Sequence, residues 1–257
     1  MWPVGQRRID YVTEGQLGSA IGLPNNRCWP GRGKLMRSSW FLCVAFLGIA
    51  AMASDHIASG KLLRVGVFDE EFLKEVSEGS WQALCPATDG LGLSTTMVRM
   101  TPAPPFAGSD EGPAPRKHVE ALECPKAIVL IRLGSLVDGH VSTAFNGTFQ
   151  LVPDAEKLLD VGTSSYRLAA RKTTPDTLEL VLRSREVEQR ISVVGGCCND
   201  AYPTLLWAGD MDRDGKIDLL LDITNHYASS NYVLFLSSAA DASHLVTEVA
   251  HFRSGSC

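Results

Sequence analysis

Residues 205–222 read LLWAGDMDRDGKIDLLLD, an acidic segment between two short apolar segments. The acidic side chains follow a D-x-D-x-D-G-x-x-D spacing at Asp210, Asp212, Asp214 and Asp218. Carboxylates at alternate positions converge only where the chain curls around a point, and the glycine that follows the third one permits a sharp turn. Each apolar flank has the length of a short strand. The stretch therefore predicts a β-hairpin whose loop gathers acidic side chains.

A cation is the natural partner for this loop, because four carboxylates stand together with no basic cluster beside them. Calcium takes about six to eight oxygen ligands, and loops of this kind add a backbone carbonyl at the seventh position. We therefore expect calcium as the cofactor, bound in a structural site at 210–218. The alternatives are an acidic turn without an ion and a catalytic or regulatory metal site. The expected ligands are Asp210, Asp212, Asp214 and Asp218 with the carbonyl of Lys216.

The loop is not an EF-hand, which needs a glutamate at the twelfth position, because Leu221 occupies that place. Residues 209–221 instead resemble a single FG-GAP/VCBS-type repeat, as in integrin-like β-propeller blades. A propeller needs several blades, and the sequence has one copy of the pattern. The resemblance therefore implies one calcium-loop hairpin within a β domain. Residues 207–257 are also similar to the C-terminal part of poorly characterised secreted bacterial proteins, which implies placement but no activity.

Short strand-like segments dominate the rest of the chain after residue 60. Residues 177–182 (TLELVL) alternate in polarity, and 127–133 (AIVLIRL) read as a buried strand. The only helix expected is a short one at 69–77. We predict a mainly β fold, a β-sandwich or barrel-like sheets with little helix. A segment rich in proline and glycine at 102–117 predicts an N-terminal β sub-domain at 54–117 and a C-terminal β domain at 118–257.

The first 53 residues are typical of an export signal rather than of a folded domain. Residues 36–53 place an arginine, an apolar run and an A-x-A site in the order of a secretory signal peptide. We expect cleavage after Ala53 and a periplasmic or secreted protein. Residues 1–35 are interpreted as a mis-assigned upstream extension, the alternative being an unusually long n-region. Cleavage would remove 6 of the 24 basic and 2 of the 29 acidic residues, which leaves a net charge near −9.

Five cysteines follow the predicted cleavage site, and in an oxidising compartment they favour disulfides over metal thiolates. We expect a bridge between Cys85 and Cys124. Cys257 is expected to pair with Cys197 or Cys198. The remaining cysteine of that pair is then buried and unreacted, links a dimer, or forms a vicinal bridge.

The composition and the motifs exclude several function classes. A net charge of −5 argues against a nucleic-acid partner. No apolar run reaches the ~18–20 residues of a membrane span, and the common hydrolase and nucleotide-binding motifs are absent. The leading hypothesis is a non-catalytic binding or structural module of the cell envelope, whose partner is a secreted or envelope protein or a glycan. The alternatives are an extracytoplasmic hydrolase, for which His226 beside the metal strand is a candidate, and a secreted inhibitor or adhesion factor.

Overall fold

The computed structural model describes residues 60–104, 114–195 and 201–255. Every described residue belongs to one compact unit of the chain. These residues form fifteen strands and one 3-10 turn, η1 (Glu70–Leu73). The predicted mainly β fold is therefore confirmed, and the helix expected at 69–77 is reduced to that single turn.

The strands vary from four to fourteen residues in length. In chain order they are β1 (Gly60–Leu63), β2 (Gly66–Asp69), β3 (Gly79–Ala87), β4 (Gly90–Ala103), β5 (Arg116–Ala121), β6 (Val129–Arg132), β7 (Gly139–Gln150), β8 (Glu156–Val161), β9 (Ser164–Thr174), β10 (Thr177–Arg183), β11 (Glu188–Gly195), β12 (Thr204–Asp210), β13 (Asp218–Asp222), β14 (Ser230–Leu236) and β15 (Thr247–Ser254).

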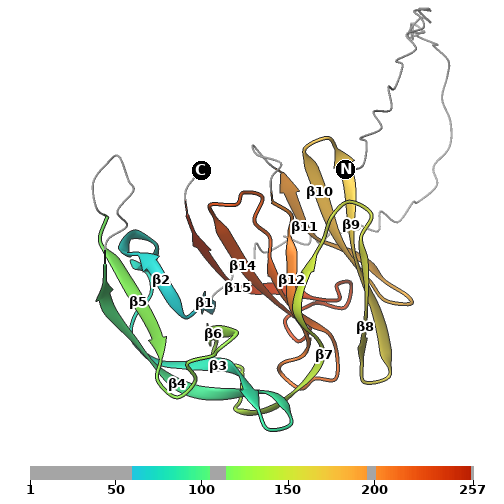
Figure 1. Ribbon diagram of the computed structural model, residues 1–257. Helices are drawn as coiled ribbons and strands as arrows, with labels where there is room; N and C mark the ends of the chain where they lie inside the picture. The colour runs from blue at the N-terminus through green and yellow to red at the C-terminus, as the bar shows by residue number, and fades with distance from the viewer. Residues whose placement is uncertain (1–59, 105–113, 196–200, 256–257) are drawn as a thin grey trace, which may run out of the picture. The chain divides into compact units, whose positions relative to one another are not determined.

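Nine of these strands close into a barrel (Figure 1). Their order is β4-β3-β6-β1-β15-β14-β13-β12-β7, and β7 returns to pair with β4. Neighbouring strands in the ring are antiparallel except β1 and β15, which run parallel. Strands β5 and β2 extend the sheet outward from β4. A second sheet, in the order β11-β10-β9-β8, completes the architecture.

Two apolar cores meet on opposite faces of strands β12–β14. In β13, Leu220 packs into the barrel interior with Trp81 and Trp207. Its neighbours Leu219 and Leu221 face outward and pack against the four-stranded sheet. Since successive strand residues point to opposite faces, a strand that is buried on both sides reads as a continuous apolar run. That explains the uninterrupted leucines after the acidic loop.

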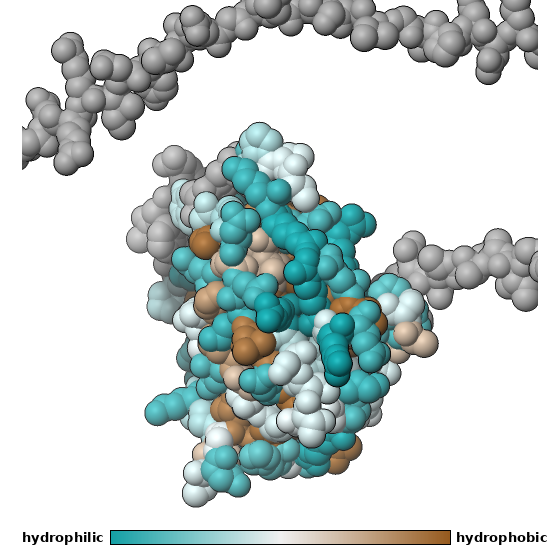
Figure 2. Space-filling model, turned by 90° about the vertical axis from the view of Figure 1, so that its right-hand side faces the viewer, coloured by the Kyte–Doolittle hydropathy of each residue, from teal (hydrophilic) through white to brown (hydrophobic). Residues whose placement is uncertain are grey.

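The four-stranded sheet packs one face into a core and carries charged side chains on the other. The buried face carries residues such as Leu168 and Leu180. The other face carries ion pairs between neighbouring strands, for example Arg190 with Glu179 at 3.3 Å. On the side of the molecule shown in Figure 2, apolar residues accordingly lie as scattered spots among hydrophilic ones. This sheet shows the one-sided burial that is typical of antiparallel structure.

The expected sub-domain boundary at residue 117 falls within one sheet. Strand β5 spans that position, and β1, β3 and β4 from before it pair with β15, β6 and β7 from after it. Residues on both sides of the boundary therefore share one barrel and one interior core.

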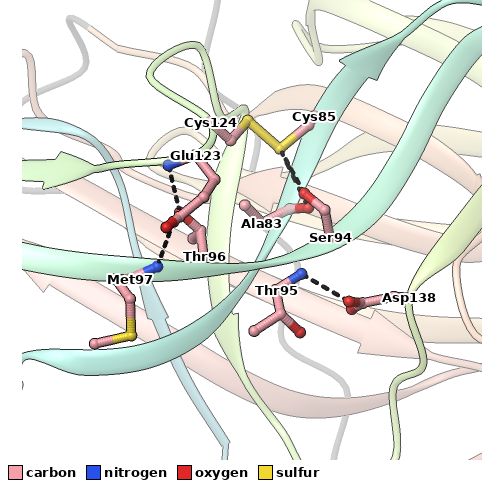
Figure 3. The surroundings of a disulfide bond; sticks show 9 residues. All are labelled: Ala83, Cys85, Ser94, Thr95, Thr96, Met97, Glu123, Cys124 and Asp138. Atoms are coloured by element: carbon pink, nitrogen blue, oxygen red, sulfur yellow. Dashed lines mark hydrogen bonds between the residues drawn. A yellow bond between two sulfur atoms is a disulfide. The ribbon is translucent and has the colours of Figure 1, made fainter.

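The predicted Cys85–Cys124 disulfide is confirmed, and it joins the end of β3 to the segment after β5 (Figure 3). Near it, the carboxylate of Glu123 accepts hydrogen bonds from the Met97 amide and the Thr96 hydroxyl, both at 2.7 Å. The expected bridge from Cys257 lies outside the described residues, as do the predicted extension at 1–35 and signal peptide at 36–53. In the described part of the chain, no helix is long and apolar enough to cross a membrane.

Candidate metal centre

The acidic segment forms the turn of the β12–β13 hairpin, as the sequence predicts. Asp210 is the last residue of β12 and Asp218 the first of β13, and Gly209 pairs with Asp218 across the hairpin. Two residues of the turn adopt left-handed backbone conformations, Arg213 with φ of 65° and Gly215 with φ of 83°. The glycine stands where the sharp turn requires it, because a left-handed conformation costs glycine little.

Three of the predicted ligands converge. Asp210, Asp212 and Asp218 each offer a carboxylate oxygen, and these three oxygens lie within 4.8 Å of one another. Asp218 is fully buried and Asp210 is 8% exposed, while Asp212 is partly exposed. Because β12 and β13 are paired barrel strands, the positions of the two buried carboxylates are set by the sheet rather than by the turn alone.

Of the other two predicted ligands, Asp214 is not in this group of three carboxylates, and the Lys216 carbonyl is a backbone atom whose part as a ligand stays a prediction. The Lys216 amide donates to Asp214 Oδ1 at 2.9 Å, and the Lys216 ammonium lies 4.0 Å from Asp214 Oδ2. Asp214 is thus occupied by neighbours from its own turn. The structure brings the three carboxylates together and places this pair beside them.

One carboxylate oxygen in the group has no hydrogen-bond partner among the described residues. Asp210 Oδ2 accepts a hydrogen bond from the Gly215 amide at 3.0 Å, but Asp210 Oδ1 is buried and accepts none. Leaving a buried polar atom unsatisfied costs about 1–3 kcal/mol, and more for a charged group. A carboxylate oxygen that is shielded from water, has no donor among the described residues and belongs to a residue of this group is suited to ligate a cation.

The same burial disfavours the charged form of both inner carboxyl groups. Burial raises the pKa of Asp218 to about 7, even though the amides of Ser237 and Met211 donate to it at 2.8 and 2.7 Å. Burial also raises the pKa of Asp210, and the negative charges of Asp214 and Asp212 raise it further. Burial and mutual repulsion therefore disfavour the ionised form of these carboxyl groups. A bound cation offsets both effects.

Two serines from a segment far along the sequence contact the acidic turn. The Ser237 hydroxyl lies 3.0 Å from both carboxylate oxygens of Asp214 and 3.0 Å from Asp218 Oδ1. The Ser238 hydroxyl donates to Asp212 Oδ2. Both serines follow β14, and sequence reasoning missed their role. No local pattern marks them, because the contacts join residues 19 to 26 positions apart.

Arg213 links the acidic turn by hydrogen bonds to the start of β7 and to the segment that precedes it. Its guanidinium donates to the carbonyls of His140 and Val137, both at 3.1 Å. The guanidinium lies so close to Gly139 that a Cβ atom there would stand 2.5 Å from it. The acidic turn is thereby tied to the strand that closes the barrel against β4.

The histidines do not assemble a catalytic triad in the described residues. The Ser243 hydroxyl and Asp241 Oδ1 both contact the same ring nitrogen, Nδ1 of His244, at 3.1 and 2.8 Å. A serine triad needs the hydroxyl and the carboxylate on opposite ring nitrogens. This group instead stabilises a turn in the β14–β15 connection. His226 lies in the β13–β14 turn, at the end of β13 opposite to the acidic loop, and stacks on Tyr227.

Comparisons of this chain with protein-family models, with curated proteins and with solved structures find no match. The resemblance of residues 209–221 to an FG-GAP/VCBS repeat stays a prediction from the sequence. The three carboxylates and the unsatisfied oxygen of Asp210 are the features of this site that bear on its chemistry.

Proposed function

We propose that this is an exported β-barrel protein in which calcium, bound at 210–218, holds the barrel in its folded form. The observation that carries the proposal is the buried Asp210 Oδ1, which has no partner among the described residues and belongs to a group of three carboxylates. The export step rests on the signal-like sequence at 36–53.

The choice of calcium follows from the ligand set. The group offers oxygen donors only, which suit hard cations such as calcium. The oxygens lie within 4.8 Å of one another, and twice a calcium–oxygen distance of ~2.4 Å is also about 4.8 Å. Each pair of oxygens therefore lies within the span that one shared calcium ion allows, and the group is compatible with a single ion between the three carboxylates. Asp214 and the Lys216 carbonyl are the proposed additional ligands.

A structural role follows from the placement of the carboxylates. Two of them come from the ends of paired strands in the barrel, and the turn between them is fastened on both sides by Arg213 and Ser237. An ion that binds the folded form alone stabilises it by mass action. We further propose that the protein is a non-catalytic module that binds a secreted or envelope protein or a glycan.

Calcium binding is tested directly by titrating the purified full chain with calcium chloride in a calorimeter. We expect one binding event, which Asp210→Asn and Asp218→Asn each weaken by at least an order of magnitude, because each removes a buried anionic ligand. Asp89→Asn is the matched control, since it makes the same charge change on the exposed β3–β4 turn. Absence of heat from the unaltered chain would overturn the proposal.

The effect on folding is tested by thermal melting in calcium and in EDTA. At a free calcium concentration of 100 times Kd, the linkage contributes about 2.7 kcal/mol, which corresponds to a rise in Tm of about 5–10 °C for a domain of this size. The Asp218→Asn variant should lose most of this rise. Equal melting temperatures of the unaltered protein in calcium and EDTA would contradict a structural role for the ion.

A further inference from the structure

We infer that Ser237 and Ser238 complete the cation site, Ser237 as a hydroxyl ligand and Ser238 as a positioning residue for Asp212. The inference rests on the calcium site proposed above and extends it to a segment outside the acidic loop. Its consequence is that the ion joins two parts of the barrel, the β12–β13 hairpin and the connection that follows β14.

The Ser237 hydroxyl lies among more carboxylate oxygens than its single proton can bond. Its hydroxyl lies 3.0 Å from three carboxylate oxygens, two on Asp214 and one on Asp218. A hydroxyl has one proton to donate, and an ionised carboxylate only accepts. At most one of these three contacts is a full hydrogen bond at any moment. The other two bring oxygen lone pairs together, and a cation that binds the hydroxyl and the carboxylates turns these contacts into shared coordination.

Ser237 is also held in place independently of its hydroxyl. Its amide donates to Asp218 Oδ1 at 2.8 Å, and the residue is 3% exposed. The backbone bond therefore fixes the Ser237 oxygen beside Asp218, which is one of the three converging carboxylates. A hydroxyl that is buried, fixed and surrounded by carboxylate oxygens is placed as a hard-cation ligand.

Ser238 contacts the exposed side of the group. Its hydroxyl donates to Asp212 Oδ2, while Asp212 Oδ1 accepts from the Asp214 amide at 3.3 Å. Asp212 is the most exposed of the three converging carboxylates and is the one that most needs a partner to hold its rotamer. Hydrogen bonds to ligating carboxylates orient them and tune metal affinity. Ser238 thus acts on the ion through Asp212.

The experiment compares Ser237→Ala, Ser238→Ala and the control Ser243→Ala by calorimetric titration of the full chain with calcium chloride. Ser243 lies in the same connection but bonds Asp241 rather than the acidic loop. We expect Kd to rise about tenfold for Ser237→Ala and about threefold for Ser238→Ala, the usual range for one lost polar contact. The control should bind calcium with unchanged Kd, and Ser238→Thr, which keeps the hydroxyl at an exposed position, should restore affinity.

Thermal melting in calcium and in EDTA distinguishes a role of the two serines in calcium binding from a purely structural role. If the serines serve the ion, the difference in Tm between calcium and EDTA shrinks in the alanine variants. An equal drop in both buffers, with Kd unchanged, would overturn the inference and leave the calcium site standing. If the unaltered chain itself binds no calcium, the proposed function fails first. Should Ser237→Ala fail to fold, the Ser238→Ala and Ser238→Thr pair decides, because unchanged Kd in both contradicts the inference.

Discussion

At the scale of single residues, buried carboxyl groups in this protein serve different purposes according to their partners. Asp222, at the end of β13, lies outside the acidic loop, and its Oδ1 accepts two hydrogen bonds, from the amides of Thr224 at 3.1 Å and Asn231 at 3.0 Å. Burial nevertheless raises its pKa. The turn therefore needs an acceptor oxygen at position 222, whereas burial disfavours the negative charge of the Asp222 side chain.

We predict that Asp222→Asn stabilises the protein at neutral pH. The amide oxygen keeps both hydrogen bonds, and the substitution removes a charge that burial disfavours. The sign follows from linkage: an acid with a raised folded pKa destabilises the native state as pH rises from the unfolded value through the folded one. The gain should be present at pH 8 and absent at about pH 3, where both forms are neutral.

Melting curves of the unaltered protein and Asp222→Asn at these two pH values check the prediction. Asp222→Ala is the companion variant, because it removes the acceptor and should cost about 1–3 kcal/mol by leaving two amides unsatisfied. A loss of stability in Asp222→Asn at pH 8 would show that the charge itself is needed at this turn.

At the scale of elements, the strands that the sequence predicted correctly are those with a strong apolar pattern. The segment at 177–182 matches β10, and the flanks of the acidic loop match β12 and β13. Residues 62–68 (LLRVGVF), which could pass for one strand, are divided between two, because β1 pairs inside the ring whereas β2 pairs with β5 outside it. Strand β8 was missed, because Lys157 on its inward face and the exposed Leu158 on its outward face break the polar–apolar alternation at 156–161.

The disulfide between the end of β3 and the segment after β5 carries an element-scale prediction. It closes a loop with a sequence separation of 39 residues, for which chain entropy gives about 4 kcal/mol at 25 °C. We expect the Cys85→Ala/Cys124→Ala double variant to lose up to that amount in urea unfolding. Reducing agent should destabilise the unaltered chain more than the double variant, which retains only the predicted bridge from Cys257. Equal stability of the two proteins under oxidising conditions would contradict a stabilising role for the bridge.

At the scale of the whole described domain, strands β12–β14 couple two cores into one structure. Their inward residues fill the barrel and their outward residues pack against the small sheet. A substitution that destabilises one core is therefore expected to destabilise the other. The ring itself closes through contacts between distant parts of the sequence, such as β1 with β15 and β4 with β7.

We predict that Leu180→Ala, in the small sheet, destabilises the barrel. The leucine is fully buried in the core between the barrel and the small sheet. The cavity left by truncating a buried leucine to alanine costs about 2–5 kcal/mol. Trp81 and Trp207 lie in the barrel core and report its unfolding by fluorescence. The urea midpoint of the tryptophan signal should fall together with that of the far-ultraviolet circular dichroism. An unmoved tryptophan transition would show that the small sheet unfolds by itself.

The β character of the chain and the acidic hairpin follow from the sequence alone, and the expected Cys85–Cys124 bridge is present in the structure. Alternating polarity and the spacing of carboxylates are local properties, and they survive any arrangement of the strands around them. The folded chain adds that nine strands close into a barrel, that Asp210, Asp212 and Asp218 form the converging group, and that Ser237 and Ser238 contact the loop. These outcomes depend on strand pairing and burial between residues far apart in the chain, for which one sequence carries no local signal.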